Sequence, residues 1–283
     1  MSHPPFATEF LVQQFSNLSN FEYVAAGSQK AVYSAQNSQL GKIALKILFP
    51  GASTERFERE IAAVQQISCD HVPKVIDHGQ LPSPYENHFW LTEQWIDGVS
   101  LRDKLNSGPI SNKLILQIGL DVLKVLVEVE AKNIVHRDIK PENILISPDE
   151  SLCWLVDFGI ARHLDKTSLT AAFMPHTLGY APIEQLNAHK HEIDSRSDIY
   201  SLGVTIYECV ERTNPFIADA KSVDEVVRRT ENLVLPGITR QVDAKGELNE
   251  LVVAMTRPQR NHRIGTAEEA YQWMNEIIAA GTT

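Results

Sequence analysis

The sequence has few cysteines, none of them paired by spacing. Cys69, Cys153 and Cys209 are scattered, odd in number and without the spacing of metal ligands. This argues against a disulfide framework and against a cysteine-based zinc site. It is typical of reduced thiols that pack as small hydrophobic side chains in a cytoplasmic protein.

Basic side chains are also scarce relative to acidic ones. The 283 residues include 26 Lys and Arg against 36 Asp and Glu, giving a formal net charge of −10. A chain of this charge is not expected to bind nucleic acid through a general phosphate-neutralising surface. The hydrophobic content of 43% is that of a globular protein, and the length allows one large domain or two packed lobes.

Long hydrophobic runs are missing as well. The first residues, "MSHPPFATEF", lack a basic region followed by an apolar core, and Ser2 stands where myristoylation requires glycine. The most apolar window, residues 114–131, contains too many polar groups to span a membrane and predicts a core helix. We therefore expect a cytoplasmic location and no membrane partner. A hydrolase is not indicated, because the chain has no Gly-x-Ser-x-Gly motif.

The pattern of secondary structure changes near residue 97. Before it, short β-branched and aromatic runs alternate with turn-like segments and predict antiparallel strands. One helix interrupts them, with Phe57 and Ile61 on its apolar face. After "DGVSL" the pattern is mainly helical, with amphipathic segments at 112–132, 197–211 and 266–279. The chain is therefore predicted to be α+β, with a small antiparallel β-rich lobe followed by a larger α-helical one.

Two polar stretches lie in the predicted second lobe. "HRDIKPEN" places Asp138, Lys140 and Asn143 within six residues, and "VDFG" places Asp157 fourteen residues after Asn143. Apolar runs flank the turn-like "SPDES" between them, so we expect a β-hairpin that brings Asp138, Asn143 and Asp157 together. Carboxylate and amide oxygens suit Mg²⁺, which takes one or two protein carboxylates together with substrate phosphates.

The combination of these two polar stretches resembles the eukaryotic-type Ser/Thr protein kinase family, and the sequence "GYAPIEQ" is more like that of a bacterial member. The resemblance runs from about Phe21 to about Ile278. It implies a bilobal protein kinase fold with an N-lobe at 21–93, a hinge at 94–98 and a C-lobe at 99–278. Residues 1–20 form an N-terminal extension with a short helix around "ATEFLVQQFSN".

The resemblance assigns roles to the polar stretches. It implies that Asp138 accepts or orients the proton of the substrate hydroxyl and that Lys140 steadies the transferring phosphoryl group. Asn143 and Asp157 match the two metal ligands, for Mg²⁺ or alternatively Mn²⁺. His136 matches a ring that packs under the Asp-Phe-Gly segment, which is a structural role. The sequence "DIKPEN" favours Ser or Thr as the residue that accepts the phosphoryl group.

The first lobe is expected to hold ATP. Strand alternation places Ala44 and Lys46 on one face, and Lys46 matches the lysine that contacts the α- and β-phosphates. Glu60, on the predicted helix, matches its glutamate partner. Glu58 is the nearby competitor, but it lies ~200° around the helix from Glu60 at ~100° per residue.

The phosphate-covering loop departs from the family pattern. Its three glycine positions hold Ala25, Gly27 and Lys30, and Val32 follows. Because glycine lets the backbone approach phosphates closely, these replacements are expected to weaken or reshape nucleotide binding at Ala25, Gly27 and Val32. Lys30 either compensates with its charge or points to solvent.

"EQWIDG" resembles the hinge, where the main chain of Gln94 and Ile96 would contact adenine. A gapless match puts Glu93 at the back of the adenine pocket, where a carboxylate is unusual. A misalignment by one residue is the alternative reading.

Residues 159–184 resemble the activation segment. Glu184 is expected to pair with Arg263, and Thr177 to contact Asp138 and Lys140. Phosphorylation of Thr170 or Thr167, or less favourably Ser168, is expected to order this segment. Asp198 of "DIYSLG" matches the residue that holds the catalytic loop through backbone amides. Solvent exposure is the simpler interpretation of His189, His191 and the Arg228 and Arg229 pair.

The expected function is transfer of the ATP γ-phosphate to Ser and Thr hydroxyls of proteins, with autophosphorylation of the activation segment. Expected partners are protein substrates and a second copy of the chain for trans-autophosphorylation. The alternative is a pseudokinase that acts as an ATP-regulated interaction module. A small-molecule kinase of the same broad fold is disfavoured by the full activation segment.

Overall fold

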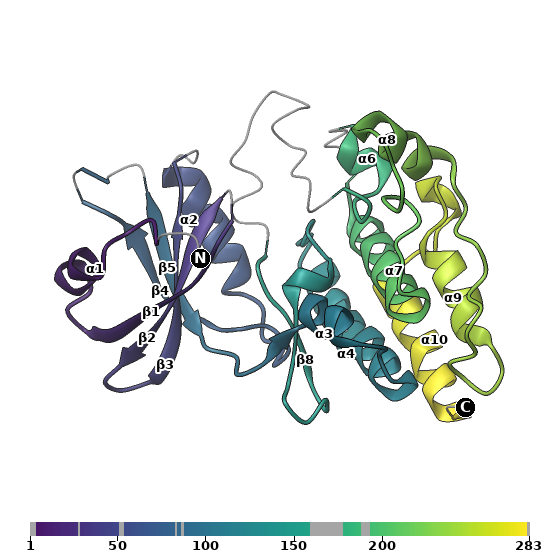
Figure 1. Cartoon of the computed structure of the whole chain (residues 1–283), viewed down its shortest axis with the longest axis horizontal. Helices are drawn as coiled ribbons and strands as arrows, with labels where there is room; N and C mark the ends of the chain where they lie inside the picture. Colours follow the sequence, from purple (N-terminus) through teal and green to yellow (C-terminus); the bar gives the residue numbers. More distant parts are fainter. Residues whose placement is uncertain are drawn as a thin grey trace. The chain divides into compact units, whose positions relative to one another are not determined.

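A computed structural model of the protein describes residues 4–27, 29–50, 54–82, 84–85, 88–158, 178–187 and 193–281 (Figure 1). The chain divides into two compact units. The described residues of the first unit lie in Met1–Gln66 and Pro73–Ile96. Those of the second lie in Ile67–Val72, Asp97–Gly159 and Thr167–Thr283. The first unit is built on a sheet and the second on helices, which confirms the predicted α+β class.

The first unit contains a five-stranded antiparallel sheet with the strand order β1-β2-β3-β5-β4. The strands are β1 (Leu18–Ala26), β2 (Lys30–Asn37), β3 (Gly41–Leu48), β4 (Val75–Gln80) and β5 (Phe89–Gln94). The central strand β3 is buried from Ile43 to Leu48. Side chains alternate along a strand, so both faces of this sheet must be covered.

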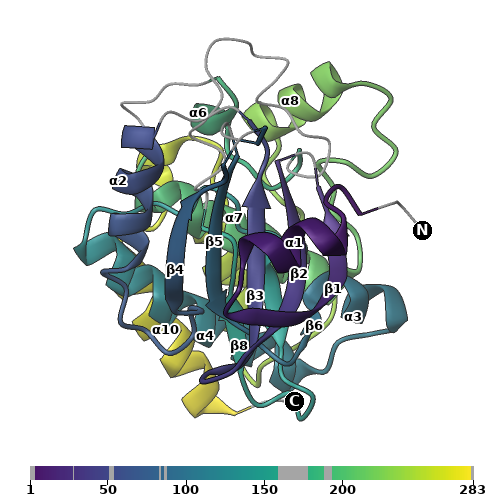
Figure 2. The same ribbon diagram turned by 90° about the vertical axis from the view of Figure 1, so that its left-hand side faces the viewer.

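The N-terminal segment covers one face of the sheet. Helix α1 (Thr8–Gln14) lies across the strands in Figure 2, and Phe6, Leu11 and Phe15 pack against the side chains of β2 and β3. On β3 these are Ile43, Leu45 and Ile47. The predicted N-terminal extension therefore contributes to the hydrophobic core of the first unit.

Helix α2 (Thr54–Val64) covers part of the opposite face. Phe57 and Ile61 pack with Leu48, Phe89 and Leu91. Leu48 belongs to the same alternating set of β3 side chains as Lys46, so α2 lies on the face of the sheet that carries Lys46. The helix predicted from the spacing of Phe57 and Ile61 is present and is buried as expected.

The second unit is a helical assembly with a small three-stranded sheet of order β6-β7-β8. Helices α4, α7, α9 and α10 pack on one another. A Cβ atom at Gly203 of α7 would lie 2.6 Å from Thr256 Cγ2 and 2.9 Å from Met255 Cβ, so α7 requires glycine to approach the end of α9. The helices are α3 (Leu101–Ser107), α4 (Asn112–Ala131), α6 (Ile183–Leu186), α7 (Ser195–Glu211), α8 (Val223–Asn232), α9 (Glu247–Met255) and α10 (Ala267–Ala280), with the short 3₁₀ turns η1 (Pro141–Asn143) and η3 (Arg260–His262).

The short strands of the second unit are β6 (Val99–Ser100), β7 (Ile144–Ile146) and β8 (Cys153–Leu155). Strands β7 and β8 pair antiparallel, with Ile144 opposite Leu155. The hairpin predicted between the two polar stretches is therefore confirmed. Among the helices that the structure describes, none combines the length and the apolar composition needed to cross a membrane.

Candidate active site

The loop that carries "HRD" is held by a buried carboxylate of α7. Asp198 accepts hydrogen bonds from the backbone N–H of His136, at 2.6 Å, and of Arg137, at 2.7 Å. Both oxygens of Asp198 are used, and the residue is 1% exposed. The predicted anchoring role of Asp198 is confirmed by these two bonds.

His136 uses both of its ring nitrogens to hold backbone. Nε2 lies 3.1 Å from the carbonyl of Val156, so it donates, and Nδ1 accepts from the Asp138 N–H at 3.2 Å. The ring packs edge-on against Phe158 with 4.5 Å between centroids. These contacts fix the neutral tautomer and leave no ring nitrogen for proton transfer. His136 is therefore structural, as expected.

Asp138, Lys140 and Asn143 are joined by direct contacts. Lys140 Nζ lies 3.1 Å from Asp138 Oδ1, and the side-chain nitrogen of Asn143 donates to the backbone oxygen of Asp138 at 2.7 Å. Because that nitrogen is used, the Asn143 side-chain oxygen is the atom suited to a metal ion. The Val156 N–H donates to the Asn143 carbonyl at 2.9 Å, which places Asp157 directly after a residue bonded to Asn143.

Two residues of this region have backbone angles that side chains rarely adopt. Arg137 has φ of 67° and Asp157 has φ of 65°. Such left-handed conformations cost of order 1–3 kcal/mol each and persist only where the surroundings enforce them. Asp198 enforces the first through the Arg137 amide, and the β7–β8 hairpin leads into the second. Arg137 directly precedes Asp138, and Asp157 directly follows Val156, whose N–H is bonded to Asn143, so both strained residues lie next to groups of the candidate site.

Burial, the largest influence, raises the pKa of Asp198 to about 7, although the amides of Arg137 and His136 act in the opposite direction. The carboxyl group ionises near 3.8 in the unfolded chain. Its contribution to stability is therefore fully present below that pH and is lost as the pH rises towards 7. Between about pH 4 and pH 7, the unfolding free energy should fall more for the wild type than for Asp198→Asn, which cannot ionise.

Chemical denaturation of both proteins across this pH range measures the effect. Asp198→Asn is expected to be less stable in absolute terms, because its amide replaces one of the two acceptors with a donor. Parallel stability curves for the two proteins would show that Asp198 does not titrate in this range.

The register of the large sheet places the expected nucleotide residues on one face. Ala25 lies opposite Val32, Val32 opposite Lys46, and Lys46 opposite Leu91, so these four share a row across the sheet. Ala44 lies two residues before Lys46 on β3 and faces the same way. The predicted common face of Ala44 and Lys46 is thus extended to Ala25 and Val32.

Lys46 has an ion-pair partner on the neighbouring strand. Its Nζ contacts Glu93 Oε1, and the two side chains are 8% and 11% exposed. Glu93 is the carboxylate expected behind the adenine pocket. The pair expected between Lys46 and Glu60 of α2 stays a prediction.

Backbone groups of the phosphate-covering loop and of the hinge differ in whether they are already hydrogen-bonded. Gly27 closes the β1–β2 turn by donating its N–H to Lys30 at 3.0 Å, and a Cβ atom there would meet nothing within 4 Å. At the other end, the Gln94 N–H donates to the Lys74 carbonyl at 2.9 Å, whereas Ile96 lies beyond β5 and is buried. A main-chain contact of Gln94 with adenine would therefore use its carbonyl rather than its N–H.

Arg102 of α3 joins three segments in a network that the sequence did not indicate. Its guanidinium bonds Glu142 at 2.9 Å, Glu208 at 2.8 Å and the Tyr180 hydroxyl at 2.6 Å, and Tyr180 also donates to Glu208. Burial acts to lower the pKa of Arg102, but the bonds to Glu208 and Glu142 outweigh it and raise the pKa. The network ties the loop of Asp138 to the segment that begins α6.

No short-range signal could have found this network, because its members are 40, 78 and 106 residues from Arg102. A lone arginine in "SLRDKL" looks like any exposed helical residue.

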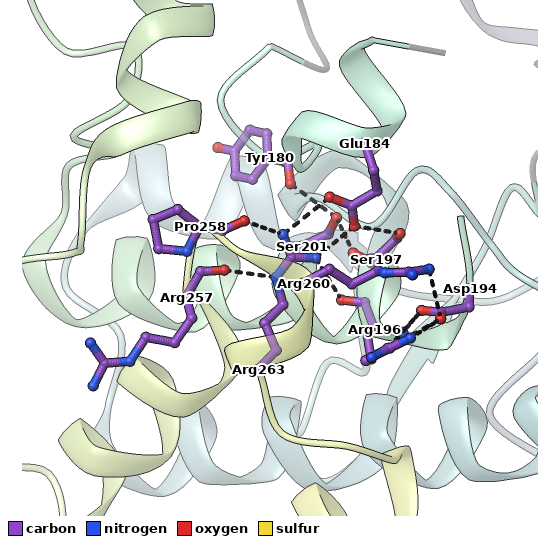
Figure 3. Close-up of polar contacts among 10 residues, drawn as sticks. All are labelled: Tyr180, Glu184, Asp194, Arg196, Ser197, Ser201, Arg257, Pro258, Arg260 and Arg263. Atoms are coloured by element: carbon purple, nitrogen blue, oxygen red, sulfur yellow. Dashed lines mark hydrogen bonds and ion pairs between the residues drawn. The ribbon is translucent and has the colours of Figure 1, made fainter. Parts of the chain in front are cut away.

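The expected pair between Glu184 and Arg263 is confirmed (Figure 3). The guanidinium binds both carboxylate oxygens, at 2.6 and 3.1 Å, and the two side chains are 3% and 0% exposed. Arg263 also donates to the carbonyls of Arg257 and Pro258, and Ser197 donates to Glu184. The start of α6 is thereby fixed to α7 and to the residues before α10.

Several expectations fall outside the described residues. They concern Gly159 of the Asp-Phe-Gly stretch, the phosphorylation candidates Thr167, Ser168 and Thr170, Thr177, and the histidines His189 and His191.

Comparison with known proteins places this geometry in context. Residues 19–274 match the model of the protein kinase domain family. The serine/threonine-protein kinase PknB of Mycolicibacterium smegmatis is 29% identical over 256 residues, which cover 88% of this chain and 41% of that protein. Serine/threonine-protein kinase A of Synechocystis is 36% identical over 222 residues, covering 71% and 42%.

The chain thus spans less than half the length of these curated relatives. Among solved structures, the PknI kinase domain of Mycobacterium tuberculosis aligns with a TM-score of 0.66 at 20% identity, covering 92% of this chain and 96% of that one. This likeness shows the fold.

Proposed function

Because the chain belongs to the protein kinase domain family, we propose that it is a Ser/Thr protein kinase that transfers the γ-phosphate of ATP to protein hydroxyls. The observation that carries the proposal is the contact of Asp138 with Lys140 and Asn143, beside the hairpin that leads to Asp157. Every charged position of this set is retained, which argues against the pseudokinase alternative.

In this function Asp138 orients the substrate hydroxyl and accepts its proton. Lys140, 3.1 Å from that carboxylate, is placed to steady the phosphoryl group between nucleotide and acceptor. Family members use ATP and a divalent metal, and the oxygens of Asn143 and Asp157 fit Mg²⁺, with Mn²⁺ as the alternative. The metal, when bound, offsets negative charge on the phosphates.

The sheet face of the first unit is proposed to bind the nucleotide. Ala25, Val32 and Ala44 present small apolar side chains on the face that carries Lys46, which suits a planar base and its phosphates. Gly27 has open space beside its backbone, so close approach of a phosphate is sterically permitted there. Main-chain groups of Gln94 and Ile96 would complete adenine binding, and Glu60 would support Lys46.

We further infer that its substrates are proteins, that two copies meet for trans-autophosphorylation, and that neither nucleic acid nor membrane is a partner. A cytoplasmic location is favoured by the cysteines. All three are reduced and buried, and burial raises the pKa of the Cys153 and Cys209 thiols, which keeps these two unreactive.

Intact and peptide mass spectrometry after incubation with Mg-ATP tests the proposal. The wild type should gain phosphates on Thr or Ser, with Thr170 and Thr167 as the expected sites. Asp157→Ala, which lacks a proposed metal ligand, should gain none and controls for contaminating kinases. If the wild type modifies neither itself nor a generic Ser/Thr protein substrate while ATP still binds, the interaction-module alternative replaces the proposal.

A further inference from the structure

The ion pair between Lys46 and Glu93 is built into the sheet. Glu93 lies opposite Ala44, and Lys46 lies opposite Leu91, so the two charged residues are diagonal neighbours on adjacent strands. Diagonal neighbours on one face are close enough for long side chains to touch. The contact is therefore fixed by the β3–β5 register, between two strands neither of which is at the edge of the sheet.

The direct cross-strand neighbours of the pair are apolar. The direct cross-strand neighbours of Lys46 are Val32 and Leu91, and those of Glu93 are Ala44 and Val75. Both residues are buried, at 6% and 9% exposure. Opposite charges attract more strongly where water is excluded, and a buried charge that loses its partner is costly. The carboxylate therefore holds the ammonium firmly.

We propose that Glu93 determines the affinity of this protein for ATP by competing with the nucleotide phosphates for Lys46. The inference rests on the proposed function, in which Lys46 contacts the α- and β-phosphates. A lysine ammonium is a compact charge on a flexible stem, and an ion pair with a carboxylate neutralises it. ATP must draw Lys46 away from Glu93, or share it, before the phosphates gain its charge.

The size of the effect follows from the fraction of time that Lys46 is available. When only part of a population is competent to bind, the apparent dissociation constant rises in inverse proportion to that fraction. If Glu93 holds Lys46 for all but about 10% of the time, removal of the carboxylate tightens ATP binding about tenfold.

The test is the Glu93→Gln variant, which keeps the size of the side chain and removes its charge. Calorimetric titration with Mg-ATP should give a dissociation constant about tenfold lower than that of the wild type. In kinase assays the KM for ATP should fall by a similar factor. Glu93→Met, which also removes the charge at similar volume, should behave the same way. It provides the test if Glu93→Gln does not fold. Glu55→Gln, an exposed glutamate of α2, is the matched control and should change neither constant.

A double-mutant cycle separates competition from a packing effect. In a Lys46→Met background, Glu93→Gln should no longer tighten ATP binding, because the contested group is gone. Equal tightening in both backgrounds would overturn the proposal. So would equal or weaker ATP binding by Glu93→Gln, and weaker binding would mean that Glu93 positions Lys46 for the nucleotide.

Failure of the proposed enzymatic function gives a different result. If the wild type transfers no phosphate but Glu93→Gln binds Mg-ATP more tightly, the proposed kinase activity is refuted. The proposed competition between Glu93 and the phosphates for Lys46 is then supported. If neither protein binds Mg-ATP, both proposals fall.

Discussion

Replacing Asp138 with asparagine is expected to lower kcat for phosphotransfer by about 10²- to 10⁴-fold, the usual contribution of a positioned general base. Asparagine preserves the shape of the side chain but cannot accept a proton. Backbone N–H groups of His136 and Arg137 donate to Asp198, and the Asp138 N–H donates to the His136 ring, so these bonds that shape the loop do not involve the Asp138 side chain. The fold and the affinity for Mg-ATP should therefore be retained.

Steady-state kinetics on a protein substrate, with thermal unfolding measured in parallel, provides the check. Asp224→Asn makes the same chemical change at an exposed position of α8 and should leave kcat unchanged. An Asp138→Asn protein that is folded, binds Mg-ATP and turns over at the wild-type rate would remove Asp138 from the mechanism. Loss of ATP binding in this variant would instead indicate a role in the nucleotide site.

Replacing Arg263 with methionine is expected to destabilise the protein by roughly 3–5 kcal/mol, the usual cost of removing one partner of a buried ion pair. Glu184 would keep its bond from Ser197 but would lose both guanidinium contacts while remaining 3% exposed. The carbonyls of Arg257 and Pro258 would also lose their donor. Thermal unfolding should show the largest fall in Tm of the variants considered.

Two further proteins sharpen this measurement. Arg228→Met makes the same substitution at an exposed position of α8 and should change Tm little. Replacing Glu184 and Arg263 together by methionine removes both charges and should recover part of the loss, because no unpaired charge stays buried. If Arg263→Met unfolds at the temperature of Arg228→Met, the ion pair does not hold α6 in place.

Short-range patterns in the sequence predicted several features of the fold. Alternation along "KIALKIL" predicted that Ala44 and Lys46 share a face, and the two apolar runs around "SPDES" predicted the hairpin between Asn143 and Asp157. Helical spacing predicted that Phe57 and Ile61 are buried. Each of these features depends on residues close together in the chain, whose period of two or of 3.6 reports which side chains face the same way.

Pairs between distant motifs were accessible only through resemblance to a known family. The hydrogen bonds that Asp198 accepts from the His136 and Arg137 amides were expected because these residues stand in recognisable stretches. The same holds for the pair of Glu184 with Arg263. Neither is indicated by composition or periodicity.

The partners of Lys46 and Arg102 depend on how distant parts of the chain pack together. Lys46 and Glu93 are 47 residues apart and become neighbours through the β3–β5 register. Arg102 reaches Glu208 across 106 residues, and the backbone of Arg137 is held in a left-handed conformation next to a buried carboxylate. Periodicity in a sequence states which face a side chain occupies, but not which other strand or helix lies against that face. That choice is made by the packing of the whole unit, and here it sets the partners of Lys46 and Arg102.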